Sequence, residues 1–247
     1  MTTLPPIIEA LREAKAIAVL TGAGVSKESG IPTFRDAMEG LWAKYDPAEL
    51  ATPEAFARDP EKVSRWYDER RVRCSAARPN PGHRALADLQ AWCGERGKSF
   101  TLITQNIDRL HQAAGSHDVI ELHGTIWVWR CTLCGDEQEE RGGPFERYPP
   151  LCACGGFRRP AVVWFGEMLP EQALRRAFDT AEASDLFFSI GTSGLVTPAA
   201  DLIHIAARRG ARTAEINMEP TSITGLTDWA IHAPAGEALP RLAAALV

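Results

Sequence analysis

The sequence predicts an α/β fold in which a doubly wound parallel sheet is joined by a small zinc-binding domain and a helical insert. Short apolar runs of strand length alternate with stretches of helical apolar spacing, the pattern of a parallel sheet covered by helices. Several of these runs end in glycine-bearing polar clusters, and such sheets bind ligands beyond the carboxyl ends of their strands. Two close cysteine pairs interrupt the alternation and predict the metal-binding part.

Composition bounds the class of protein. The 247 residues are 45% hydrophobic and 24% charged, which is ordinary for a globular chain with a sizeable core. The net charge of −5 argues against nucleic acid as a partner. No apolar run approaches the ~20 residues of a membrane span, and the N-terminal segment lacks the features of a secretory signal. The six cysteines suit a reducing cytoplasm better than a disulfide scaffold, so we expect a cytoplasmic protein without a membrane partner. The oligomeric state is not indicated.

The first elements follow from punctuation and spacing. A helix is predicted over 5–15, with proline in its first turn, and the apolar run 16–20 follows as a strand. Helical character over 54–74 is interrupted near Asp59–Pro60 and stops at the proline- and glycine-rich breaker 78–82.

The later elements repeat the alternation. Apolar spacing of three residues predicts a helix over 83–96, and Gly115 ends a shorter helix over 109–114. Helices are also expected over 171–183, 198–209 and 237–246. Apolar runs predict strands over 100–103, 119–122, 162–165, 186–190, 213–216 and 229–232.

The stretch 16–36 carries the first functional signal. Its strand ends abruptly at Gly22-Ala23-Gly24, where glycines let the backbone approach a pyrophosphate. The dinucleotide fingerprint is incomplete because Lys27 stands where a third glycine belongs, so the turn alone is also compatible with a purely structural role. The polar segment 26–35 that follows is too rich in glycine, proline and serine for a plain helix. We expect it to form a loop that closes over a ligand.

Polar clusters at the carboxyl ends of several strands predict one composite site. Parallel strands present these ends on one rim of the sheet. The clusters are Gly22–Gly24, Gln105–Asp108, His123–Gly124, Gly191–Ser193 and Asn217.

The four clustered cysteines predict a structural zinc site. Cys131 and Cys134 are separated from Cys152 and Cys154 by 17 residues, and four thiolates close a tetrahedron around zinc. The second pair is tighter than the usual C-x2-C, which leaves open whether both of its members are ligands or one ligand comes from elsewhere. The alternative is four unligated cysteines in a polar loop. Glycines after Cys134 and Cys154 supply the turns that a zinc knuckle needs.

Together these pieces resemble the sirtuin family of NAD-dependent protein lysine deacylases. The matching motifs occur in the family's order and span almost the whole chain: GAGVS with SGIPTFR, TQNID, ELHG, the cysteine pairs, VVWFGE, GTS and NMEP. The resemblance implies a Rossmann-like NAD-binding domain made of 1–36, 75–125 and 160–247. It also implies a small domain that combines a helical insert, 37–74, with a zinc ribbon, 126–159.

The resemblance implies that NAD is consumed as a co-substrate while an acyl group leaves a protein lysine. The acyl oxygen would attack C1′ of the nicotinamide ribose, and the products would be free lysine, nicotinamide and 2′-O-acyl-ADP-ribose. His123 is the candidate base for a ribose hydroxyl, because imidazole titrates near neutral pH. Its bland alternative is a satisfied histidine at a strand end.

Other residues gain roles from the same resemblance. Asn106, counted as catalytic, and Asp108 would pair with the nicotinamide carboxamide, and Gln105 with a ribose hydroxyl, although helix capping would also explain them. Phe34 would shield C1′ from water, with Arg35 supporting that loop. The full NAD-binding set is Gly22, Ala23, Gly24, Ser26, Thr33, Phe34, Arg35, Trp42, Gln105, Asn106, Ile107, Asp108, Gly191, Thr192, Ser193, Asn217, Glu219 and Ala235.

A second set would hold the acylated lysine. The backbone at Val163, Phe165 and Gly166, facing 194–196, would bind the substrate peptide as an added strand. Tyr67 and Arg70 lie three apart on one face of the expected helix, and class III sirtuins read an acyl carboxylate with a Tyr-x-x-Arg at this place. A solvated helical pair is the alternative. We therefore expect removal of succinyl and malonyl groups, and also of acetyl.

Three rival functions keep parts of this pattern. A nicotinamide dehydrogenase would share the strand–glycine–helix entry, but it predicts a fuller glycine fingerprint. A non-catalytic zinc-ribbon protein would bind nucleic acid or ADP-ribose. A protein mono-ADP-ribosyltransferase would use the same fold and the same NAD site.

Overall fold

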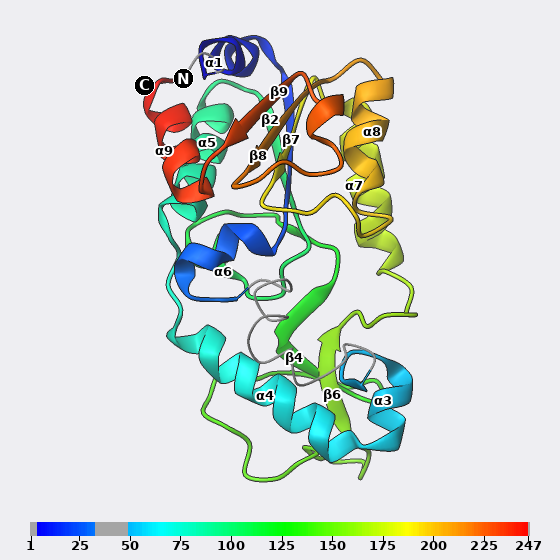
Figure 1. The fold of residues 1–247 in the computed structure, drawn as a ribbon. Coiled ribbons are helices and arrows are strands. Elements are labelled where there is room, and N and C mark those ends of the chain that lie inside the picture. Colours follow the sequence, from blue (N-terminus) through cyan, green and yellow to red (C-terminus); the bar gives the residue numbers. More distant parts are fainter. Residues whose placement is uncertain (1–3, 33–48, 247) are drawn as a thin grey trace.

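The larger sheet is parallel and doubly wound, as predicted (Figure 1). The computed structural model describes residues 4–32 and 49–246. Within them the strand order is β3-β2-β1-β7-β8-β9. The bounds are β1 (Ala16–Thr21), β2 (Ser99–Thr104), β3 (Ile120–Glu121), β7 (Leu186–Ile190), β8 (Arg212–Asn217) and β9 (Trp229–His232). The chain winds outward from β1 through β2 to β3 and then restarts at β7, so the switch of direction lies between β1 and β7.

Helices cover both faces of this sheet because its central strands are apolar on both sides. One face packs against α1 (Leu4–Glu13), α5 (Pro81–Glu95) and α9 (Ala235–Ala244) in the first core cluster. The other packs against α7 (Glu171–Ala183) and α8 (Asp201–Arg208) in a second one (Figure 1). The short helix α6 (Leu110–Ala113) follows the loop after β2.

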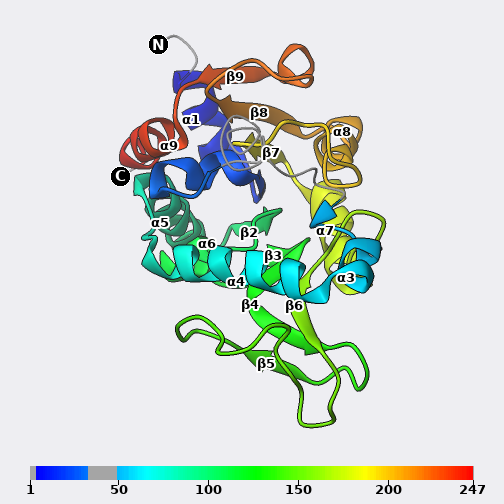
Figure 2. The same ribbon diagram turned by 60° about the horizontal axis from the view of Figure 1, so that its bottom comes forward.

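A small antiparallel sheet projects from the larger one (Figure 2). Its order is β5-β4-β6, with β4 (Gly124–Cys131), β5 (Glu137–Glu139) and β6 (Arg158–Val162). The helices α3 (Pro53–Arg58) and α4 (Pro60–Ala76) pack on it around Tyr67, Trp129 and Trp164 in a third core cluster.

The expected strand over 162–165 is wrong. The strand is β6, which ends at Val162 and pairs with β4 in the small sheet. Residues 163–165 pair with no strand in the part of the chain that the structure describes. The N–H of Val163 donates to His123 O, that of Phe165 to Ala51 O, and that of Trp164 to the Glu167 side chain. The sequence did not predict β4 at all.

Local capping explains the remaining boundaries. Asp59 ends α3 and caps α4 through its Oδ1, which accepts from Lys62 N, so the interruption predicted at Asp59–Pro60 is confirmed. Asn80 caps α5, so the breaker 78–82 also opens the next helix. The helix expected to open at Pro198 begins later, at Asp201. Two 3-10 turns, η1 (Ala23–Ser29) and η4 (Thr224–Leu226), follow β1 and β8.

Among the residues described, we find no helix that combines the length and the apolar character needed to cross a bilayer.

Candidate active site

Glycines bring two strand-end loops into contact at the switch point. Gly22 N donates to Ile190 O at 3.0 Å and Gly24 N to Gly191 O at 2.8 Å. A Cβ at Gly22 or Gly24 would lie 2.8 or 2.7 Å from Gly191 O, closer than a carbon and an oxygen can pack. Gly191 itself has φ +60°. The glycines predicted for a dinucleotide turn therefore also let the loop after β1 pack on the loop after β7.

Beneath this turn, Ser26, Asn106 and Asp108 form one buried hydrogen-bonded cluster. Ser26 Oγ donates to Asp108 Oδ2 at 2.7 Å and accepts from Asn106 Nδ2 at 3.1 Å. Asn106 Nδ2 also donates to Gly22 O at 3.1 Å. No described residue donates to Asn106 Oδ1, which leaves this acceptor for a ligand.

The Asp108 side chain bonds the start of α6, whose N-cap residue is Arg109, so it supports that helix without being its cap. Its Oδ1 accepts from Leu110 N at 2.8 Å, and Trp127 Nε1 donates to its backbone oxygen at 2.8 Å. Burial raises the pKa of its carboxyl, since the charged form loses hydration there. The side chain is thus held from several directions next to the nucleotide turn.

Gln105 connects the loop after β7 to His123. Its side chain donates to Thr192 Oγ1 at 2.9 Å, and its backbone oxygen lies 3.0 Å from His123 Nδ1. A carbonyl oxygen only accepts, so Nδ1 of His123 carries the hydrogen and Nε2 of the neutral ring keeps a free lone pair. Partial burial lowers the pKa of His123. This tautomer suits a general base.

Other residues of the predicted NAD-binding set lie beyond the glycine turn. Asn217 Nδ2, at the end of β8, donates to Thr192 O at 2.8 Å. Ala235 begins α9, and the next N–H in that helix donates to Glu28 at 2.8 Å. Ser193 and Glu219 lie in the loops after β7 and β8, without a hydrogen bond to this cluster among the described residues. The predicted residues Thr33, Phe34, Arg35 and Trp42 lie outside the described residues.

Two buried histidines support the site from below. His83 and His111 have ring centroids 4.8 Å apart. His111 Nε2 lies 2.9 Å from Thr21 Oγ1, and His83 Nε2 lies 3.5 Å from Ser26 Oγ. Burial lowers the pKa of His83 to about 4 and that of His111 to about 3, so both rings are neutral at physiological pH. The bland interpretation of both residues as structural fits these contacts.

On the small-domain side, Tyr67 and Arg70 project from one face of α4, as predicted. Tyr67 is buried against Trp66 and Trp164, with ring centroids 4.7 and 6.0 Å away. The guanidinium of Arg70 stacks over Trp66 at 3.9 Å. Burial raises the pKa of Tyr67 and lowers that of Arg70, so an uncharged phenol and a poorly hydrated cation lie side by side.

The segment after β6 is held by an ion pair that the sequence analysis did not identify. Arg159 donates through both terminal nitrogens to Glu167, at 2.6 and 2.9 Å, and its guanidinium stacks on Trp164 at 3.3 Å. Glu167 Oε2 in turn accepts from Trp164 N at 2.9 Å. These contacts fix the turn through Gly166, which has φ +86°. An arginine and a glutamate flanking an apolar run were the available signal.

The four clustered cysteines converge at the tip of the small sheet. Their sulfurs lie within 4.8 Å of one another, with separations of 3.5 Å for Cys131–Cys154, 3.7 Å for Cys134–Cys152 and 3.4 Å for Cys134–Cys154. A tetrahedral Zn–S bond of ≈ 2.3 Å requires sulfurs ~3.8 Å apart, which this geometry approaches. All four thiols fit one structural zinc, so the tight spacing of the second pair does not remove a ligand.

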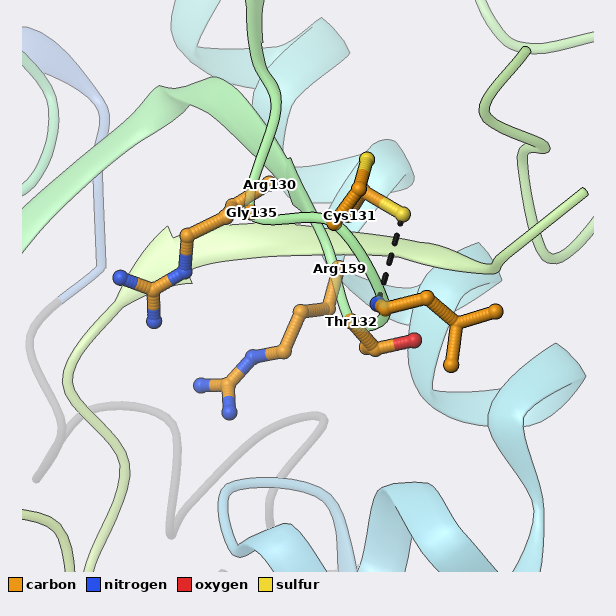
Figure 3. A pocket seen from close by; sticks show the side chains of 7 residues that line it. Arg130, Cys131, Thr132, Gly135 and Arg159 are labelled. Carbon is orange, nitrogen blue, oxygen red and sulfur yellow. Dashed lines mark hydrogen bonds between the residues drawn. The ribbon is translucent and has the colours of Figure 1, made fainter. Parts of the chain in front are cut away.

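An arginine and a backbone N–H act on this cluster. Figure 3 shows that the side chains of Arg130 and Arg159, which line the neighbouring pocket, extend away from the sulfur of Cys131. On the neighbouring strand, Arg158 donates to Cys152 Sγ at 3.5 Å. The backbone N–H of Cys134 is the main cause that lowers the pKa of the Cys131 thiol to about 6. This backbone N–H therefore favours the thiolate of Cys131, the form that binds zinc.

Known proteins share this architecture. Residues 22–198, more than half of the chain, match the sequence pattern of the Sir2 family. The chain belongs to the Sir2 family. The NAD-dependent protein deacylase 2 of Pyrobaculum aerophilum is 52% identical over 237 residues, which are 96% of this chain and 93% of the relative.

Solved Sir2 structures agree with this assignment. A mutant Sir2 homologue in complex with 2′-O-acetyl ADP ribose is 44% identical, with a TM-score of 0.91 over 98% of this chain and 95% of that one. A Sir2 protein with a p53 peptide and NAD+ is 32% identical, with a TM-score of 0.83 over 97% of this chain and 96% of that one.

This Sir2 protein is an NAD-dependent protein deacylase that forms O-acyl ADP-ribose, and its four-cysteine cluster is consistent with one structural zinc. Of the rival functions, hydride transfer and a non-catalytic zinc ribbon are not supported.

Proposed function

We propose that this Sir2 protein removes succinyl and malonyl groups from protein lysines, with acetyl as a further substrate, as a class III member of the family. The observation that carries the proposal is the pair formed by the buried Tyr67 and the half-buried Arg70 on one face of α4. Burial lowers the pKa of Arg70, which means that its charge lacks part of the hydration it would have in water. An acyl carboxylate would restore that compensation through the planar guanidinium, and Tyr67 would add a hydrogen bond.

We assign the NAD half of the reaction to the cluster at the switch point. His123 would take a proton from a ribose hydroxyl through Nε2, because Nδ1 is held by Gln105 O. Asn106 would offer Oδ1 to the nicotinamide carboxamide, since its Nδ2 is already bonded to Ser26 and Gly22. We propose that the remaining members of the predicted NAD-binding set also contact NAD, as the family resemblance implies.

We assign the substrate backbone to a slot between two loops. The loop after β6 includes Val163, Phe165 and Gly166, and the loop after β7 includes Leu195. The N–H groups of Gly166 and Leu195 have no acceptor among the described residues, so a peptide strand can pair with them. A Sir2 protein solved with a p53 peptide supports the substrate class.

The division into domains supports this slot. We propose that 37–74 and 126–159 form the small domain and that 1–36, 75–125 and 160–247 form the Rossmann-like domain. The separate third core cluster, which joins α3 and α4 to the small sheet, supports this division. A cytoplasmic location stays a proposal that rests on the unpaired cysteines.

The acyl preference is tested with three peptides of one sequence that carry succinyl-, malonyl- or acetyl-lysine. Mass spectrometry after incubation with NAD reports acyl loss and the O-acyl ADP-ribose product together. For Arg70→Met we expect kcat/KM for desuccinylation to fall about 100-fold, since truncating one partner of a buried charge pair typically costs 2–5 kcal/mol. Deacetylation should change less than about threefold, because acetyl has no carboxylate.

Arg73→Met is the matched control, since Arg73 is an exposed arginine on the same helix and should affect neither reaction. Equal losses on the succinyl and acetyl peptides of Arg70→Met would remove the carboxylate role. A product in which labelled ADP-ribose is attached to the protein would instead favour the mono-ADP-ribosyltransferase alternative.

A further inference from the structure

A buried glutamate outside the predicted site anchors a turn next to the substrate slot. Glu215 lies in β8 and is 1% exposed. It has no cationic partner among the described residues. Its Oε1 accepts from the Thr221 hydroxyl and its Oε2 from the Thr224 hydroxyl. Both carboxylate oxygens therefore accept hydrogen bonds from one short turn that follows the strand.

The same two hydroxyls organise the turn itself. Thr224 Oγ1 accepts from Thr221 N at 2.7 Å, and Thr221 Oγ1 accepts from Ile223 N at 3.3 Å. Each hydroxyl thus donates to Glu215 and accepts from the backbone of the turn. A carboxylate accepts both donated hydrogens, whereas an amide of the same size would accept only one and would point its own donors at the other hydroxyl.

This turn is the surface on which Gly194 rests. Ser222 Oγ donates to Gly194 O at 3.4 Å. A Cβ on Gly194 would lie 3.2 Å from both Ser222 Oγ and Ile223 Cγ2, so the two segments are in close contact. Ile223 is 2% exposed and is part of the second core cluster, which gives the turn a rigid base.

We propose that Glu215 is a positioning residue for the substrate peptide. Through Thr221 and Thr224 it fixes the turn that supports Gly194, and through Gly194 it sets the place of 195–196, one wall of the slot. The inference rests on the proposed peptide slot. The proposed role affects binding of the peptide and not of NAD. The hydrogen bond from Asn217 to Thr192 O, on the NAD side, depends on the end of β8 and not on this turn.

The test is steady-state kinetics of Glu215→Gln with NAD and the acyl peptide varied in turn. We expect KM for the peptide to rise about five- to tenfold and KM for NAD to stay within about twofold. Thr221→Val, which removes one of the two hydroxyls, should give the same split and serves as the second variant if Glu215→Gln folds poorly. Equal rises in both KM values, or no rise in either, would overturn the inference.

Thr213→Val is the matched control. Thr213 is buried in the same strand, and its hydroxyl also bonds a carboxylate, Asp228 at 3.1 Å, but at the other end of β8. It should lower the melting temperature without changing either KM value. A Thr213→Val enzyme that shows the same KM split would mean that any weakening of β8 is sufficient, which would overturn the inference.

Gly194→Ala separates this inference from the proposed slot. Gly194 has φ +67°, so alanine is strained there and also meets Ile223. A higher peptide KM in Gly194→Ala with an unchanged one in Glu215→Gln would overturn the positioning role alone. An unchanged peptide KM in Gly194→Ala would remove the slot itself.

Discussion

At the residue scale, the sequence predicted which polar side chains meet wherever a motif directly follows a strand. Ser26, Asn106 and Asp108 come from two loops, yet they meet because parallel strands end on one rim. Arg159 and Glu215 were missed for the opposite reason. Each bonds a partner several residues further along the chain, and a charged residue beside an apolar run is a weak signal because it does not show which later residue it contacts.

The lowered pKa of His123 predicts how activity depends on pH. Its base form is the neutral ring, and burial lowers its pKa below the ordinary 6.5. The working form therefore persists as the pH falls, and kcat/KM should decline with a one-proton slope only below pH 6.5. The measurement is a pH profile of deacylation at saturating NAD.

Two variants test whether this pH profile reports on His123. His123→Ala should lose at least about 100-fold in rate, within the range that general-base catalysis contributes. His117→Ala removes an exposed imidazole and should keep the wild-type profile. A midpoint clearly above 6.5, or an unaltered profile in His123→Ala, would contradict the assignment.

At the scale of elements, α4 shows why some boundaries could be read and others could not. Its start at Asp59–Pro60 is a local capping signal, and the sequence predicted it. The apolar run 162–165 looks like a strand by composition, but a strand also needs a ladder partner, and the partner of this region, β4, pairs with the residues before it. Pairing across distant segments cannot be read from one apolar run.

The same helix carries a fully buried ion pair whose two members also bond the zinc ribbon. Arg71 and Asp68 are both completely buried, with Arg71 Nη2 2.6 Å from Asp68 Oδ1. Arg71 also donates to three backbone oxygens, at Glu140, Gly142 and Gly143, so each of its polar nitrogens has a partner. Asp68 Oδ2 accepts from the Tyr148 hydroxyl at 2.5 Å.

Removing the arginine should therefore destabilise the protein strongly. For Arg71→Met we expect the free energy of unfolding to fall by about 3–5 kcal/mol, because the buried carboxylate of Asp68 loses its cationic partner and three backbone oxygens lose their donor. Urea denaturation measures it. Arg175→Met breaks an exposed pair with Glu171 and should change it by less than about 0.5 kcal/mol. A loss below about 1 kcal/mol in Arg71→Met would mean that the pair does not fasten α4.

At the scale of the whole molecule, the alternation of strands and helices was sufficient to predict the large sheet. The strand order was not readable, but a doubly wound topology limits it to few choices, and its polar rim follows from any of them. The large sheet has two core clusters of its own, and the small sheet packs in a third. Each of the two parts is therefore stabilised by its own apolar core.

Zinc removal tests that difference. The tip of the small sheet, from Cys131 to Phe157, has mostly exposed residues and little apolar core, so the metal supplies much of its order. A chelator should abolish deacylation, because this segment leads into β6 and the substrate slot. NAD binding measured by calorimetry should survive, since its predicted contacts lie on the large sheet. Limited proteolysis should cut within 132–157 and spare the large sheet.

Cys134→Ser should reproduce the effect of the chelator, and added zinc should restore the chelated wild type but not this variant. Cys93→Ser is the thiol control, because Cys93 is buried in the first core cluster and takes no part in the four-cysteine site. Loss of NAD binding in parallel with loss of the ribbon would show that the two parts unfold as one unit. In that case the separate core clusters would not be separate in stability, and the zinc would support the nucleotide site as well as the peptide slot.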